Sequence, residues 1–272
     1  MSKSVVDVIF HASKDVVPSG VMPTLRPSQG YHQLFMALGY LPREANVADF
    51  LRHYHGLSGV WLMASPLHWE ATHNDGMVRA AGDGLCLTDD ESRRLFCAFS
   101  NFIEANNMRL HYHDAVTWLL QADSYPVPDV PPVHELLDHS MRPALQALEP
   151  TAFWLRFITE SQMFFSAISS TVNGLWVWGG KAMPAQPPER AIIVCADDEA
   201  WLKACLGLVS QVEWFNPTSR VPRGGVYFVP DPAWMNASDL AFHLRDQHVR
   251  WHWNNMMYVS KPRSWFSRLW RR

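Results

Sequence analysis

Short apolar runs alternate along this chain with longer segments of helical periodicity, and this alternation restricts the fold more than any other feature. The runs VVDVIF, AIIVC and GVYFV are rich in β-branched and aromatic residues, which is typical of strands. Segments with apolar residues three and four positions apart, typical of helices, occupy residues 30–41, 46–57, 88–106, 151–170 and 236–257. Because the two kinds of segment are interleaved, the sequence predicts an α/β fold, or a mixed α+β fold, in which helices flank a mixed sheet.

Two of these helices carry start signals. Thr88 precedes acidic residues and an apolar stripe, so we expect it to cap the helix of residues 88–106. The segment 236–257 is predicted to be one long helix, capped by Asn236 or Ser238. Its aromatic residues are expected to pack against the rest of the protein.

The chain of 272 residues is 48% hydrophobic, which is enough to bury a sizeable core. Residues 123–133, DSYPVPDVPPV, are too rich in proline to form a regular element. We therefore predict an N-terminal part (1–122), a connector (123–133) and a C-terminal part (134–272) that together form one compact unit.

Charge and cysteine usage exclude several classes of protein. The formal net charge is −3, so no nucleic-acid partner is expected. The four cysteines are scattered without a C-x-x-C pair, which is typical of reduced thiols. The segment MSKSVVDVIFHASKD lacks the apolar run of a signal peptide, and no segment approaches the roughly 20 apolar residues of a membrane span. These features predict a cytoplasmic protein.

The stretch VNGLWVWGG has the pattern of a strand between two bends. Trp176 and Trp178 point to one face of such a strand, Asn173-Gly174 provides a turn into it, and Gly179-Gly180 allows a sharp bend after it. The resulting aromatic surface either walls a pocket or packs in the core. Both alternatives stay open from the sequence.

The helix predicted at 151–170 places two polar side chains among its apolar rows. Glu160 falls in the row that contains Phe157 and Phe164, and Gln162 falls in the neighbouring row. A carboxylate on an apolar face needs a partner or stays protonated. Glu160 and Gln162 are therefore either ligand-binding residues beside Trp176 and Trp178 or contacts that fix the fold.

The segments TESQM and VNGLWVWGG together resemble the signature of the bacterial RpfE-type regulatory proteins, and His68 lies in a further similar segment, MASPLHW. The chain departs from that pattern at Thr159 and in lacking a His-Pro pair in the spacer. The residues that match the pattern are Glu160, Gln162, Met163, Asn173, Trp176, Trp178, Gly179 and Gly180. All of them except Met163 are our candidates for ligand binding.

This family is often labelled as similar to cofactor-independent phosphoglycerate mutase, which implies an alkaline-phosphatase-like core, two metal ions and a serine nucleophile. Such an enzyme is expected to have an Asp-Gly-rich turn after its first strand. This chain has Asp7 and Ser13 in that region but lacks the turn. We therefore expect a regulatory protein that binds a protein or small-molecule ligand and needs no cofactor. The alternative is a divalent-metal phosphoryl-transfer enzyme, phosphomutase-like or phosphohydrolase-like, whose catalytic candidates are His68, His73 and Asp75.

Two histidine motifs invite a metal reading. In HELLDH, the second histidine follows His134 by five positions, so a helix would not present both on one face. In HYHD, His111 and His113 share one face of a strand and lie beside Asp114, but the sequence supplies no third ligand.

The basic segment 261–272 ends in SWFSRLWRR. Its tryptophans and arginines would suit either contact with an anionic membrane surface or docking on the domain.

Overall fold

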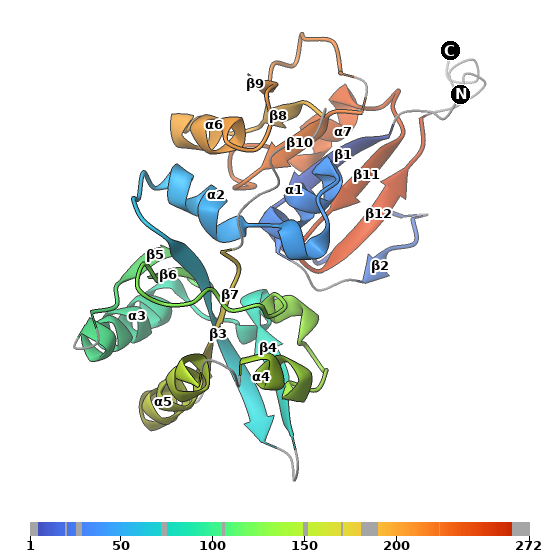
Figure 1. Cartoon of the computed structure of the whole chain (residues 1–272). Coiled ribbons are helices and arrows are strands. Elements are labelled where there is room, and N and C mark those ends of the chain that lie inside the picture. Colours follow the sequence, from blue (N-terminus) through green and yellow to red (C-terminus); the bar gives the residue numbers. More distant parts are fainter. Residues whose placement is uncertain are drawn as a thin grey trace, which may run out of the picture. The chain divides into compact units, whose positions relative to one another are not determined.

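The structure is a computed structural model that describes residues 5–19, 21–25, 29–71, 75–104, 107–148, 152–169, 171–180, 190–222 and 224–262. The mixed α/β fold is confirmed: the elements form two sheets flanked by helices (Figure 1). The chain divides into two compact units, which are described separately. Unit 1 comprises Met1–Pro42 and Pro184–Arg272, and unit 2 comprises Arg43–Met183.

Unit 1 is built on a largely parallel sheet of seven described strands, in the order β2-β12-β11-β1-β10-β8-β9. The five strands from β11 to β9 are parallel, whereas β12 and β2 add to one edge in antiparallel pairing. The strands are β1 (Val6–Phe10), β2 (Thr24–Leu25), β8 (Ile192–Val194), β9 (Val212–Trp214), β10 (Val226–Val229), β11 (Val249–His252) and β12 (Met256–Ser260). The helices are α1 (Gly30–Leu38), α6 (Glu199–Leu206) and α7 (Ala237–His243).

Helices cover both faces of this sheet. On one face, Val8 and Tyr227 pack in a core that includes Leu240 of α7. On the other face, the Phe228 ring lies 6.2 Å from the ring of Tyr31 in α1 and 5.5 Å from that of Trp201 in α6. Since both faces are covered, the central strands are apolar at nearly every position, which explains the uninterrupted runs in the sequence.

Unit 2 contains an antiparallel sheet in the order β4-β3-β6-β5, with β7 paired to β3. Its strands are β3 (Trp61–Ala71), β4 (Gly76–Ala81), β5 (Leu110–Asp114), β6 (Thr117–Gln121) and β7 (Gly174–Trp178). Its helices are α2 (Val47–Tyr54), α3 (Asp89–Glu104), α4 (Arg142–Leu148) and α5 (Phe153–Ile168). The short 3-10 helices are η1 (Pro42–Glu44), which spans the division between the units, η2 (Gly82–Leu85) and η3 (Val133–Glu135).

The predicted cap of α3 is confirmed. Glu91 N donates to Thr88 Oγ1 at 3.2 Å, and Thr88 N donates to Glu91 Oε2 at 3.2 Å. This reciprocal capping box satisfies backbone donors that a helix start leaves unpaired. The helix then packs on α5, where the Phe99 and Phe165 rings lie 4.7 Å apart.

The prediction of one long helix over 236–257 is wrong. The segment forms the short helix α7 and the strands β11 and β12. β11 pairs in parallel with β1, so that Val6 lies opposite Val249 and Val8 opposite Trp251. Pairing with a strand more than 200 positions earlier overrides the local helical period, which a sequence window does not contain.

The chain also divides at places other than those predicted. The connector 123–133 lies inside unit 2, and the boundaries fall at Pro42 and Met183. The reason is the pairing of β1 with β10 and β11, which joins the N-terminal segment to the C-terminal third of the chain. Among the described residues, no helix has both the length and the apolar character needed to cross a membrane. The basic tail lies outside the described residues from position 263 onward.

Candidate functional site

The carboxyl ends of the parallel strands of unit 1 meet at one edge of its sheet, where ligands bind in many open α/β folds. Asn254, just after β11, organises this edge: its backbone N–H donates to Ala12 O at 2.8 Å, and its Oδ1 accepts from Gly30 N at 2.8 Å. Position 30 requires glycine, because a Cβ there would lie 2.7 Å from the backbone of His11. The start of α1 is thereby held against the loop that follows β1.

A small hollow of about 170 Å³ lies beyond the ends of β8, β9 and β10. It adjoins a larger groove of about 740 Å³, since the two share Phe215, Trp234 and Met235. The hollow is completed by Cys195, Ala196 and Asp197, which follow β8 directly. The groove extends along the start and outer side of α7, and its remaining lining residues are Pro217, Ser219, Val221, Asn236, Asp239, Phe242, His243, Arg245 and Asp246.

The groove combines aromatic surface with carboxylates. Trp234 is 37% exposed and Phe242 is 71% exposed, so both rings are open to a ligand. Among the described residues, Asp197 and Asp239 form no ion pair. The guanidinium of Arg245 already lies over the Phe242 ring, at 4.3 Å. The surface is therefore aromatic and, on balance, acidic.

A buried charged cluster lies near the amino ends of the same strands. Asp7 on β1 is 0% exposed; it accepts from Arg250 Nη2 at 2.8 Å and from His252 Nε2 at 2.8 Å, and Arg190 Nη2 lies 2.8 Å away. Burial by itself raises the pKa of this carboxyl group, but the hydrogen bonds from His252 and Arg250 outweigh it and bring the pKa to about 2. Arg190 in turn donates to the backbone carbonyls of Gly224 and Ala37. The cluster fixes β1 against its neighbours and leaves no open carboxylate.

The pKa of Asp7 predicts an acid-sensitive contribution to folding. Because its folded-state pKa of about 2 lies below the ordinary 3.8, the unfolded chain binds more protons between these values, and stability falls as the pH decreases through that window. The contribution is roughly 2–3 kcal/mol, since each pKa unit corresponds to about 1.4 kcal/mol. Urea unfolding of the wild type and of Asp7→Asn at pH 5, 4 and 3 should show the difference between them shrinking; a constant difference would contradict the assignment.

Trp176 and Trp178 lie in the core of unit 2, and both are buried. Trp176 Nε1 donates to Pro131 O at 2.9 Å, and Trp178 Nε1 donates to Ser65 Oγ at 2.9 Å. Trp154 of α5 likewise donates to Pro126 O, at 2.7 Å. Two indole N–H groups thus donate hydrogen bonds to backbone carbonyls of the proline-rich connector. The prolines of the connector have no backbone N–H that could join a sheet. Of the two alternatives left by the sequence, the structure supports core packing.

The other residues of the same motif flank that core. Asn173 binds the backbone of Trp69 twice, accepting from its N at 2.9 Å and donating to its O at 2.7 Å. Gly179 and Gly180 have φ values of 70° and 118°, which confirms the sharp bend. A Cβ at Gly180 would also collide with the Leu62 side chain.

The helix α5 does not aim its polar residues at the core as predicted. Its buried side chains are Trp154, Phe157, Ile158, Ser161 and Phe165. Glu160 and Gln162 flank this stripe and are partly exposed, whereas Met163 is exposed. The buried stripe is centred on Ser161 and is narrower than the predicted rows. Their role in ligand binding stays a prediction.

The candidates of the phosphoryl-transfer alternative lie in unit 2. His68 on β3 donates through Nδ1 to Thr171 O at 3.2 Å. Asp75 Oδ1 accepts from Gly76 N at 2.7 Å and from Arg142 N at 3.1 Å, and a hydrogen bond from Ser140 is the main cause of its lowered pKa. Asp75 therefore holds the start of α4, at the edge of a hollow of about 420 Å³. His73 lies outside the described residues.

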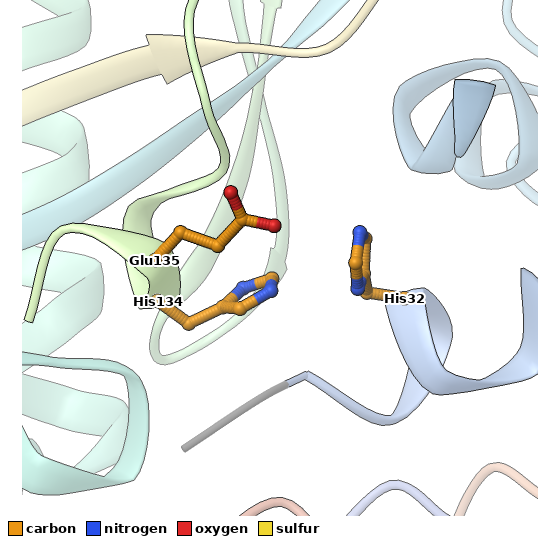
Figure 2. Close-up of side chains that lie close together, drawn as sticks. All are labelled: His32, His134 and Glu135. Atoms are coloured by element: carbon orange, nitrogen blue, oxygen red, sulfur yellow. The ribbon is translucent and has the colours of Figure 1, made fainter. Parts of the chain in front are cut away.

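The HELLDH motif begins in the 3-10 helix η3, which ends at Glu135, and it contains no α-helix. Figure 2 shows His134 and Glu135 as neighbours on η3; the third side chain drawn there, His32, belongs to α1 of unit 1 and is described with that unit. His32 Nε2 donates to Pro42 O at 3.3 Å, and burial lowers the pKa of His32. His139 is exposed and donates to Leu137 O at 2.7 Å.

His111 and His113 do share one face of β5, and the structure adds His55, which follows α2. The His55 ring lies 4.2 Å from that of His111 and 5.0 Å from that of His113. Burial and the two neighbouring histidines lower the pKa of His55 to about 4, and burial lowers the pKa of His111. Sequence spacing did not identify His55, because it lies 58 positions before His113.

Comparisons with known proteins add little to this geometry. No protein-family model and no curated protein matches the chain. Among solved structures, the chain is similar to the cofactor-independent phosphoglycerate mutase from Thermoplasma acidophilum DSM 1728, with 14% sequence identity and a TM-score of 0.33 over 94% of this chain and 89% of that chain. Membership in the RpfE-type family remains a prediction.

Sequence reasoning did not identify the groove beyond β8, β9 and β10. One signal was present: PDPAWMN directly follows a predicted strand, and loops at the carboxyl ends of parallel strands are where ligand-binding residues gather. Without the order of the strands, however, the sequence does not show that Phe215 and Trp234 meet.

Proposed function

We propose that the chain is a ligand-binding protein whose site is the groove beyond the carboxyl ends of β8, β9 and β10. One observation carries this proposal: the hollow of about 170 Å³ and the groove of about 740 Å³ share Phe215, Trp234 and Met235. Their position at the end of a parallel sheet and their mixed lining are typical of small-molecule sites.

The lining favours an organic cation with an aromatic or apolar body. The rings of Phe215 and Trp234 offer a surface on which an apolar body can stack, and aromatic faces also attract cations. The carboxylates of Asp197 and Asp239 supply the opposite charge at the hollow and in the groove. An anionic ligand would meet these acids, and Arg245, the one arginine or lysine among the described lining residues, already packs on Phe242.

The regulatory role implied by the sequence resemblance would then depend on occupancy of this groove, with the ligand or a protein partner carrying the signal. This proposal needs no cofactor and assigns no catalytic step.

Three matched indole compounds test the ligand class. We expect tryptamine, which carries an ammonium group, to bind more tightly than tryptophol, which is neutral, or indole-3-acetate, which is anionic. Isothermal titration would measure the three dissociation constants. Occupancy at about 100 times the dissociation constant should also stabilise the fold by about 2.7 kcal/mol, seen as a raised Tm.

Two variants and two controls locate the site. Asp197→Asn and Trp234→Ala should each weaken tryptamine binding at least about fivefold, since each removes roughly 1 kcal/mol or more of contact energy. Asp15→Asn and Trp214→Ala change exposed residues outside the groove lining and should leave binding unchanged. Equal binding of all three compounds, or equal effects of variants and controls, would overturn the proposal.

The phosphoryl-transfer alternative is decided by metal content. Within either unit, the described residues bring no three histidine, cysteine or carboxylate ligand atoms to within 4.8 Å of one another. Elemental analysis of chelator-free protein, with hydrolysis of a phosphomonoester as readout, separates the two functions. About two equivalents of manganese or zinc together with turnover would establish the alternative.

A further inference from the structure

We propose that His55 and His113 of unit 2 together bind a divalent late transition-metal ion, beside the ring of His111. The three imidazoles come from two elements: His55 is the residue that ends α2, and the other two lie on one face of β5. The site is independent of the groove in unit 1.

The distance between two ring nitrogens carries the argument. His55 Nε2 lies 2.9 Å from His113 Nδ1. Metal–imidazole bonds are about 2.0–2.1 Å long, so two nitrogens at this separation subtend about 90° at an ion bonded to both. That is the angle between neighbouring ligands in the tetragonal sites of copper(II) and nickel(II), whereas a tetrahedral zinc site needs about 3.3 Å.

The surroundings hold His113 in the orientation that a ligand needs. Its side chain is only 7% exposed, and its Nε2 lies 3.8 Å from Asp114 Oδ2. Asp114 is itself fixed, because its Oδ1 accepts from Val116 N at 2.9 Å. A carboxylate beside the outer ring nitrogen favours a proton there and leaves Nδ1 with its lone pair toward His55, as in carboxylate–histidine–metal arrangements.

His111 lies beside this pair. Its ring centroid lies 4.2 Å from that of His55, and Trp61 packs against its other side at 6.3 Å. Tyr54 packs edge-on against the rings of His55 and His113, at 4.7 and 5.7 Å, so the site has an aromatic wall.

Binding of nickel(II), copper(II) and zinc(II) to tag-free, full-length protein tests the proposal. Isothermal titration at pH 7.5 in a non-chelating buffer should give one nickel ion per chain, bound more tightly than zinc. His55→Ala and His113→Ala should each weaken nickel binding at least tenfold. Electron paramagnetic resonance of the copper-loaded wild type should show coupling to imidazole nitrogens, which both variants should lose.

The matched control is His139→Ala, because His139 is an exposed histidine of the same unit that bonds only to backbone near it. It should leave the nickel affinity unchanged, and circular dichroism should show all variants folded. The alternative is a simple hydrogen bond between His55 and His113. No nickel binding at 100 µM, or equal affinities of the wild type and His113→Ala, would establish that alternative and overturn the proposal. The tryptamine experiment is unaffected by either result.

Discussion

Replacing Asp7 by asparagine is expected to lower the free energy of unfolding by about 3–5 kcal/mol. Asp7 is 0% exposed and faces Arg190, Arg250 and His252. Asparagine keeps the shape of the side chain but removes the charge that these groups share. Removing one partner from a buried ionic cluster leaves the others uncompensated, which costs more than the net contribution of the pairs.

The measurement is urea unfolding at pH 7, followed by circular dichroism. Asp15→Asn removes the same charge from an exposed position in the same unit and should cost less than about 0.5 kcal/mol. If Asp7→Asn were as stable as Asp15→Asn, the cluster would contribute nothing to folding. Arg190 and Arg250 would then be candidates for binding an anion.

Replacing Trp176 by alanine is expected to cost about 3–5 kcal/mol. The side chain is fully buried, and its indole N–H satisfies the carbonyl of Pro131 in the connector. The substitution therefore opens a large cavity and also leaves a polar group without its donor. Trp176→Phe keeps most of the volume and should cost less, because it loses mainly the hydrogen bond.

Thermal and urea unfolding would measure both variants, with Trp214→Ala as control because Trp214 is 38% exposed. The result also decides the role of the Trp-x-Trp-Gly-Gly motif. A core residue should change stability and leave tryptamine binding to unit 1 intact. If the Trp176→Ala protein had wild-type stability, the motif would again be a candidate ligand-binding surface.

The individual elements were largely predictable because their signals are local. The cap at Thr88, the strand at 174–178 and the bend at Gly179-Gly180 each depend on residues a few positions apart, and all three are present. Helical periodicity predicted less well which residues at the edge of a helix face are buried. Glu160 has helical spacing with Phe157, yet it lies at the edge of the buried stripe, because the width of a contact depends on the partner surface.

The sequence by itself determined the mixed α/β class, most of the helices and strands, and the positions of the turns, since propensity, capping and period act over short distances. Only the tertiary structure decided that β11 is a strand, that the first 42 residues belong with the last third of the chain, and that Phe215 meets Trp234. It also brought His55 to His113. These outcomes depend on pairings between segments far apart in the chain, whose free energies come from strand register and burial and leave no mark in a local window.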